Sequence, residues 1–145
     1  MFFHGQHLRA LDEKSRLTIP ADYRHAFAED GLIVTRLQEP HLIVFAKERW
    51  EEVLERFRGR PLLTAQQLGD FRRLLFTNAL ITNLDTHGRV RLPDHLLKHA
   101  QITDQAVVAG TGEHIEVWSP PLWELKQAEL LTMSMTDAEQ GILGI

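Results

Sequence analysis

The sequence predicts an α+β fold made of two copies of one strand-rich module. Three observations support this: an internal repeat, short segments rich in β-branched residues, and helix-like segments between them. The 145-residue chain is 43% hydrophobic and 25% charged, which is typical of a soluble folded protein. Each module would bury only a small core, so we expect the two modules to pack against each other.

The repeat is seen when the sequence is shifted against itself by 73 residues. Residues 11–51 then match residues 84–124 without a gap, and nine of the 41 pairs are identical, against about two or three expected by chance. The identical pairs are Leu11/Leu84, Asp12/Asp85, Arg16/Arg89, Pro20/Pro93, Val34/Val107, His41/His114, Val44/Val117, Trp50/Trp123 and Glu51/Glu124.

Each copy is predicted to begin with a strand, a polar turn, a second strand and a short helix after a proline. In the first copy these are residues 7–11, 12–15, 16–19 and 21–28. In the second copy they are residues 80–84, 85–88, 89–92 and 94–100. A second hairpin follows, with strands at 32–34 and 42–45 in the first copy and at 106–108 and 115–118 in the second. A closing helix carries Trp50 or Trp123.

The segment between the copies is predicted to be helical. Thr64 and Gln67 have the spacing of a capping box, and Leu68, Phe71 and Leu75 recur at helical intervals. The tail from residue 132 has little pattern, and we expect it to be loosely ordered. The predicted division is a first module at 6–52, linking helices at 53–78, a second module at 79–125, and a C-terminal helix end and tail at 126–145.

The charged turns are the strongest functional candidates. Asp12 and Arg16 flank the first turn, and Asp85 and Arg89 flank the second. A guanidinium held by a carboxylate suits phosphate oxygens or the edge of guanine, although such a pair can equally serve only to fix its hairpin. Candidate DNA-contacting residues are Arg9, Lys14, Arg16, Arg89 and Arg91, and candidate turn-fixing residues are Asp12, Ser15, Asp85 and Gly88.

The two turn motifs resemble those of a known family. The pattern Leu-Asp-x-Lys-x-Arg-Leu-x-Ile-Pro at 11–20, repeated as Leu-Asp-x-x-Gly-Arg-Val-x-Leu-Pro at 84–93, is similar to that of the MraZ family of bacterial transcriptional regulators. The Met1-Phe2…Gly5 start, the Phe71-Arg72-Arg73…Leu75-Phe76 segment and the two tryptophan helices add to the resemblance, which extends to about residue 133.

This resemblance implies two SpoVT/AbrB-like swapped-hairpin modules, ring-like oligomers, and binding to repeated DNA sites upstream of the division and cell-wall gene cluster. Its motif falls on Asp12, Arg16, Asp85 and Arg89. One departure is Ser15, where the family usually has glycine, because serine reaches a positive φ only with strain. We therefore expect the first turn to be strained or shaped differently from the second.

Enzymatic and metal-binding functions find little support in the sequence. There are no cysteines, and no nucleophile elbow or phosphate-binding glycine loop is present. His95 and His99 are four residues apart on a predicted helix, but we find no third ligand and expect structural or surface roles. His41 and His114 suggest a shared structural hydrogen bond. The aromatic residues near Trp50 and Trp123 indicate packing, not base stacking.

We therefore expect a sequence-specific DNA-binding transcriptional regulator, in the first instance a repressor, that is not an enzyme. Its expected partners are double-stranded DNA and copies of itself in a ring larger than a dimer, with no cofactor, no small-molecule substrate and no membrane. The expected location is the cytoplasm, on the nucleoid. The net charge of −4 argues mildly against DNA, and a ring-forming scaffold without a DNA target is the alternative. A metal-dependent enzyme is a distant third.

Overall fold

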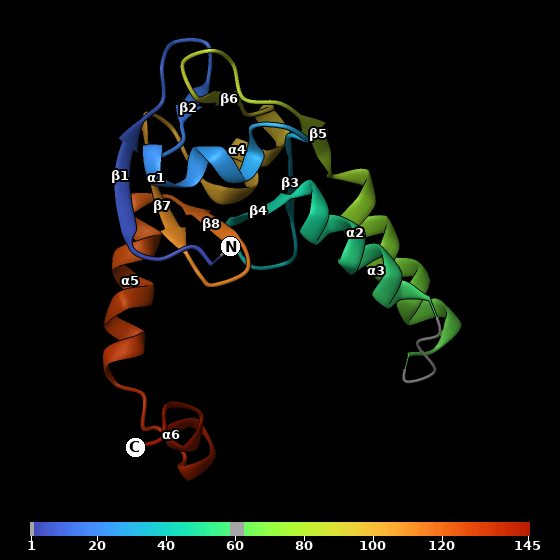
Figure 1. The fold of residues 1–145 in the computed structure, drawn as a ribbon, viewed down its shortest axis with the longest axis vertical. Helices are drawn as coiled ribbons and strands as arrows, with labels where there is room; N and C mark the ends of the chain where they lie inside the picture. Colours follow the sequence, from blue (N-terminus) through green and yellow to red (C-terminus); the bar gives the residue numbers. More distant parts are fainter. Residues whose placement is uncertain (1, 59–62) are drawn as a thin grey trace.

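The computed structural model describes residues 2–58 and 63–145 and has the predicted α+β architecture (Figure 1). In the first half the elements are β1 (Gln6–Ala10), β2 (Arg16–Thr18), α1 (Ala21–Arg24), a 3₁₀ turn η1 (His25–Phe27), β3 (Leu32–Arg36), β4 (Leu42–Ala46) and α2 (Lys47–Phe57). In the second they are α3 (Ala65–Thr77), β5 (Leu80–Thr82), β6 (Arg89–Arg91), α4 (Asp94–Ala100), β7 (Gln105–Gly110), β8 (Ile115–Trp118), α5 (Pro120–Leu131) and α6 (Asp137–Leu143).

The two halves exchange strands. The six-stranded antiparallel sheet has the order β1-β7-β8-β4-β3-β5, and a separate two-stranded ribbon pairs β2 with β6. Thus β1 of the first half pairs with β7 of the second, and β5 of the second pairs with β3 of the first. Because neither half can complete its sheet without the other, the expected swapped-hairpin arrangement is confirmed.

A pseudo-twofold axis relates the halves. In the ribbon Leu17 is the register partner of Val90, and in the large sheet Ile43 is the partner of Glu116. Both pairs are separated by the repeat offset of 73 residues, so each pairs a position with its own equivalent. The axis therefore passes through the ribbon at one end and through the β4–β8 pair at the other.

One pair from the sequence match is not equivalent in space. Leu8 pairs with Val107, and its counterpart Ile81 pairs with Ile33, so Ile33 and not Val34 corresponds to Val107. Val34 and Val108 both lie in the main core, whereas Ile33 faces the opposite side. A shift of one residue reverses the faces of a strand, so matching Val34 with Val107 was wrong. Compared with the first half, the second half has one extra residue before β7 and one residue fewer in the β7–β8 turn. The two differences cancel, so the ungapped match does not reveal them.

The main core lies between the ribbon, the short helices and one face of the large sheet. Both halves contribute fully buried residues, among them Leu17, Ile19 and Phe27 from the first and Leu92 and Leu96 from the second. A second cluster forms beneath α2 and α3 from Ile33, Ile43, Phe45, Trp50 and Leu75. The expectation that these aromatic residues pack inside the protein is confirmed.

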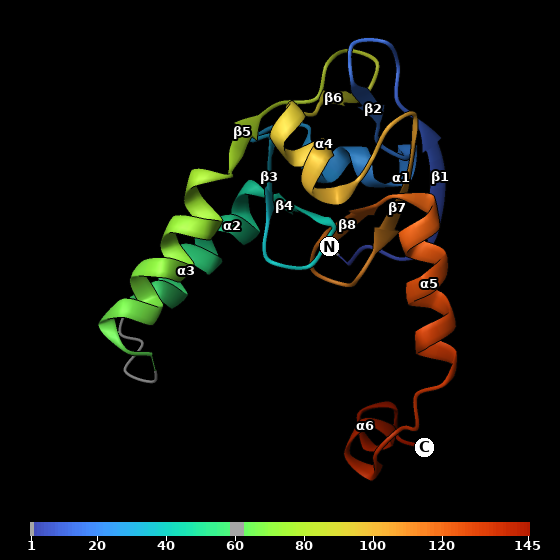
Figure 2. The same cartoon turned by 180° about the vertical axis from the view of Figure 1, so that it is seen from behind.

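Two helical arms extend from this body on opposite sides (Figures 1 and 2). The helices α2 and α3 form one arm, and the capping box of Thr64 and Gln67 begins α3 as predicted. Residues 59–62 of the predicted link and Met1 lie outside the described residues. The other arm is α5, the predicted closing helix that carries Trp123, followed by α6, which lies where the sequence predicted a loosely ordered tail. A second capping box, Thr136 with Glu139, begins α6. No helix within residues 2–58 and 63–145 is long and apolar enough to cross a membrane.

Candidate nucleic-acid interface

The first charged turn is built around one carboxylate. Asp12 Oδ1 accepts hydrogen bonds from the backbone N–H groups of Lys14 and Arg16, both at 2.9 Å. Asp12 Oδ2 accepts one from Arg16 Nε at 2.6 Å. The turn is closed by the backbone, where Ser15 N–H donates to the Asp12 carbonyl at 3.0 Å. A single aspartate therefore fixes the turn and orients the guanidinium that follows it.

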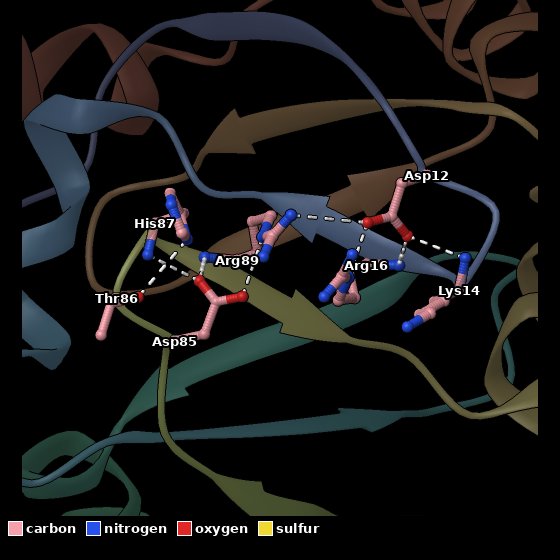
Figure 3. Close-up of polar contacts among 7 residues, drawn as sticks. All are labelled: Asp12, Lys14, Arg16, Asp85, Thr86, His87 and Arg89. Atoms are coloured by element: carbon pink, nitrogen blue, oxygen red, sulfur yellow. Dashed lines mark hydrogen bonds and ion pairs between the residues drawn. The ribbon is translucent and has the colours of Figure 1, made fainter.

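The second turn repeats this design. Asp85 Oδ1 accepts from the N–H groups of His87 and Arg89 at 2.9 Å, and its Oδ2 accepts from Arg89 Nε at 2.8 Å. Arg89 also joins the two turns, because its Nη1 lies 3.7 Å from Asp12 Oδ2. Figure 3 shows the two pairs side by side on neighbouring strands, with Arg89 between the two aspartates.

Both carboxylates are stabilised in their charged form. The backbone N–H of Arg16 lowers the pKa of Asp12 below its ordinary value of 3.8, with the guanidinium of Arg16 adding to the effect. In the same way the N–H of Arg89 lowers the pKa of Asp85 to about 2. The turns consequently keep their negative charges, and hold their arginines, at any pH above about 4.

The β2–β6 ribbon carries its cations on one face. Leu17 and Val90 point into the core, so Arg16, Arg89 and Arg91 lie on the opposite side, with Arg16 directly across from Arg91. Within the described parts of the chain, Arg91 is exposed and has no ion pair. The ribbon therefore presents two arginines fixed by carboxylates and one free to move.

The remaining predicted site residues differ in position. Lys14 is exposed at the tip of the first turn, whereas Arg9 lies on β1, pairs opposite Ala106 and donates to the carbonyl of Leu8. No contact joins Arg9 to either turn among the described residues. The structure thus brings Lys14, Arg16, Arg89 and Arg91 together and leaves Arg9 on the flank.

Ser15 adopts the conformation that glycine adopts in the second turn. Its φ is +59°, against +75° for Gly88, and the hydrogen bonds of the two turns are the same. The expected strain is present, at a cost of about 1 kcal/mol for a non-glycine residue in this region. The turn is not reshaped, because the Asp12 carboxylate fixes it.

Arg24 is a residue that the sequence interpretation missed. Its Nε donates to the carbonyl of Ile19 at 2.8 Å, and its side chain lies over Gly88, where an added Cβ would be 2.3 Å from that Nε. The signal was present in a comparison of the two copies. The second turn has Gly88 where the first has Ser15. The first copy has Arg24 where the second has Leu97.

The histidines form contacts within the fold. His99 Nε2 lies 2.6 Å from the carbonyl oxygen of Glu39, and burial lowers the pKa of His99. His41 and His114 both approach Glu116 Oε2, at 3.4 and 3.8 Å. No group of three acidic or histidine side chains in the described residues could hold a metal ion.

Comparison with known proteins agrees with this architecture. The family model described as "MraZ protein" matches residues 2–69 and 75–144, one match for each half. The chain belongs to the MraZ family. It is 36% identical over 122 residues to the "Transcriptional regulator MraZ" of Roseiflexus castenholzii, and 39% identical over 122 residues to that of Herpetosiphon aurantiacus, with 84% of each chain covered in both cases. The protein of the same name from Thermomicrobium roseum is 34% identical over 129 residues, or 89% of each chain. These names describe regulators of transcription and not a class of enzyme.

Proposed function

We propose that the chain is a sequence-specific transcriptional regulator that binds duplex DNA through the cationic face of the β2–β6 ribbon. The observation that carries this proposal is the pair of arginines, Arg16 and Arg89, whose Nε atoms are held by Asp12 and Asp85. Each guanidinium is then oriented before DNA arrives, and its Nη groups make no hydrogen bond among the described residues, although Arg89 Nη1 lies 3.7 Å from Asp12 Oδ2. Orientation in advance reduces the entropy lost on binding.

The ribbon has the form of known groove readers. A two-stranded ribbon fits the major groove of B-DNA, where arginine donates to N7 and O6 of guanine. We assign base contacts to Arg16 and Arg89, and phosphate contacts to the mobile Lys14 and Arg91. Arg9, on the flanking strand β1, would reach only the outer phosphates. Phosphate contacts would set the register, and base contacts would set the sequence.

Several copies of the chain would be needed for useful affinity. One ribbon offers few cations, and the net charge of the chain is −4. Repeated DNA sites would let linked ribbons bind together and multiply their affinities. The finer proposal is a repressor, acting on the nucleoid in the cytoplasm at repeated promoter sites of the division and cell-wall gene cluster. It would be built as a ring larger than a dimer from modules at residues 6–52 and 79–125.

Selection from random DNA tests the proposal. The purified protein would be incubated with random duplexes at near-physiological salt, and bound sequences recovered over several rounds, with Arg16→Ala as the parallel control. Enrichment of a short repeated element by the wild type, and its loss in the variant, is expected. If nothing is enriched, the ring-forming scaffold becomes the better interpretation, and the exposed apolar arms would then be its main feature.

A further inference from the structure

The two ends of the ribbon are unequal, although their turns have the same backbone. On the second turn the side chain of Arg24 occupies the space above Gly88, so that an added Cβ would lie 2.3 Å from Nε and 2.6 Å from Cδ. At the equivalent place beside the first turn the chain has Leu97, which is buried in the main core. Ser15 therefore meets no arginine from α4, and Arg24 has no counterpart beside the first turn.

A chain of hydrogen bonds holds Arg24 in this place. The carbonyl of Gly88 accepts from the N–H of Ile19 at 2.9 Å, and the carbonyl of Ile19 accepts from Arg24 Nε at 2.8 Å. The hydrogen bond between Ile19 and Gly88 has a counterpart at the first turn, because Leu92 N–H donates to the Ser15 carbonyl at 2.9 Å. The hydrogen bond between Arg24 and Ile19 has no counterpart, because the equivalent residue Leu97 has no side-chain donor. Arg24 thus braces one end of the ribbon only.

The terminal nitrogens of Arg24 are the part of this side chain that the bond to Ile19 does not use. No hydrogen bond or ion pair to its Nη atoms is found among residues 2–58 and 63–145, and the side chain is only half-buried. Its stem packs against the backbone of the second turn, which lies at one end of the ribbon. A cation at the edge of a ribbon in the major groove would meet the groove wall, which is made of phosphates.

We propose that Arg24 is a DNA-backbone contact that also positions the second turn, so that the two ends of the ribbon bind the duplex unequally. The first end would contact phosphate through the mobile Lys14, and the second through a guanidinium braced in place. This inference rests on the proposed function, because it requires that the ribbon faces DNA. It makes Arg24 important for affinity and unimportant for the choice of sequence.

Salt dependence of binding tests the assignment. The affinity of wild type, Arg24→Ala and Arg24→Met for a selected and an unrelated duplex would be measured between about 50 and 200 mM salt. Each lost phosphate contact reduces the slope of log affinity against log salt by about 0.9. We expect that reduction for each bound ribbon, and we expect the affinity for both duplexes to fall by the same factor.

Two further variants serve as controls. Arg24→Met keeps the apolar stem over Gly88 and guards against a variant that does not fold. Arg58→Ala removes an exposed cation at the end of α2 and should leave the slope unchanged.

A double-variant measurement tests the contact itself. Gly88→Ala should destabilise the wild type, because the new methyl group displaces Arg24 from its bond to Ile19 in addition to the penalty of a positive φ. In the Arg24→Ala background the same substitution should cost clearly less in melting temperature, leaving only the penalty of a positive φ.

The outcomes separate this inference from the proposed function. If the wild type binds no duplex, the DNA-binding function fails. If the wild type binds and the folded Arg24 variants keep its affinity and salt slope, the backbone contact is wrong. If these variants lose preference for the selected duplex, Arg24 reads a base and the assignment to phosphate is overturned.

Discussion

Arg16 and Arg89 differ in how completely their charges are balanced. Among the residues that the structure describes, Arg16 forms an ion pair with Asp12 alone, whereas Arg89 contacts Asp85 through Nε and approaches Asp12 with Nη1 at 3.7 Å. Arg89 is therefore shared between two carboxylates, whereas Arg16 is held by one. Lys14 adds a further charge beside Arg16. We therefore expect the first turn to be the stronger of the two proposed DNA contacts.

Replacing Arg16 by alanine should impair DNA binding while leaving the protein folded. Loss of one base-contacting arginine costs about 1–3 kcal/mol per site, and the loss is repeated in every subunit that is bound to DNA. Arg89→Ala is the matched comparison and should be milder. Melting temperature and DNA affinity would be measured on the same preparations. A destabilised Arg16→Ala protein with unchanged affinity would mean that this residue only braces its hairpin.

Acid should weaken the fold through the same turns. The lowered pKa of Asp85, about 2 against an ordinary 3.8, means that folding favours the charged carboxylate. Its stabilising effect is complete above about pH 4 and is lost as the pH falls toward 2. Asp85→Asn should lower the melting temperature at pH 7 and reduce its fall between pH 4 and 2. Asp70→Asn, on α3, is the control for removing a carboxylate elsewhere. Equal acid sensitivity in wild type and Asp85→Asn would contradict this assignment.

The β4–β8 pair shows how one element joins the halves. Glu116 lies on the pseudo-twofold axis opposite Ile43, and the equivalent histidines His41 and His114 approach it from the two halves. Trp118 Nε1 donates to Glu116 Oε1 at 2.9 Å, and His41 stacks on Trp118 with ring centres 4.5 Å apart. Burial opposes ionisation of Glu116, but the hydrogen bonds from these three side chains outweigh it and lower its pKa.

Glu116→Ile copies the apolar residue of the other half and should destabilise the protein. The substitution removes the acceptor of the buried Trp118 and His41 side chains, and a buried donor left without a partner costs about 1–3 kcal/mol. Urea unfolding would measure the loss. Glu116→Gln keeps a neutral acceptor for Trp118 Nε1 and should be milder. If the isoleucine variant is as stable as the wild type, the hydrogen bonds to Glu116 do not stabilise the pairing of the two halves.

At the scale of the whole molecule, two apolar surfaces lie on opposite arms. One is a groove between α2 and α3 lined by Val53, Phe57 and Phe71. The other is the α5–α6 arm, where Leu131 and Ile142 are 87% and 86% exposed. The two surfaces cannot meet within one chain because the arms lie on opposite sides of the body (Figures 1 and 2). Unlike surfaces that join different copies produce head-to-tail contacts, which close into rings or extend as filaments.

Self-association through these arms should be visible in solution. Light scattering should report a closed assembly larger than a dimer at micromolar concentration. Phe71→Ser in the groove and Ile142→Ser on α6 should each reduce the assembled mass. Ile81→Ser removes an equally apolar residue, 70% exposed on β5 and not among the residues that line the groove, and should not. A monomeric wild type, or a mass unaffected by either arm variant, would contradict this mode of assembly.

Features that depend on neighbours along the chain could be predicted from the amino-acid sequence. The aspartate turns, the capping box of Thr64 and the helix that carries Trp50 follow from local hydrogen bonding and periodicity, so their residues could be read in order. The repeat also indicated that two like modules would be paired. The second capping box, at Thr136, was equally local and was missed.

Only the tertiary structure decided what lies across the pseudo-twofold axis. The exchange of strands between halves, the one-residue shift of β3, the meeting of His41 and His114 at Glu116, and the placement of Arg24 over Gly88 all join residues far apart in sequence. Such contacts depend on how two modules pack, and packing is chosen by the shape and polarity of the whole core. The candidate DNA-contacting residues were therefore largely readable from local motifs, whereas the asymmetry between the two turns was decided by packing.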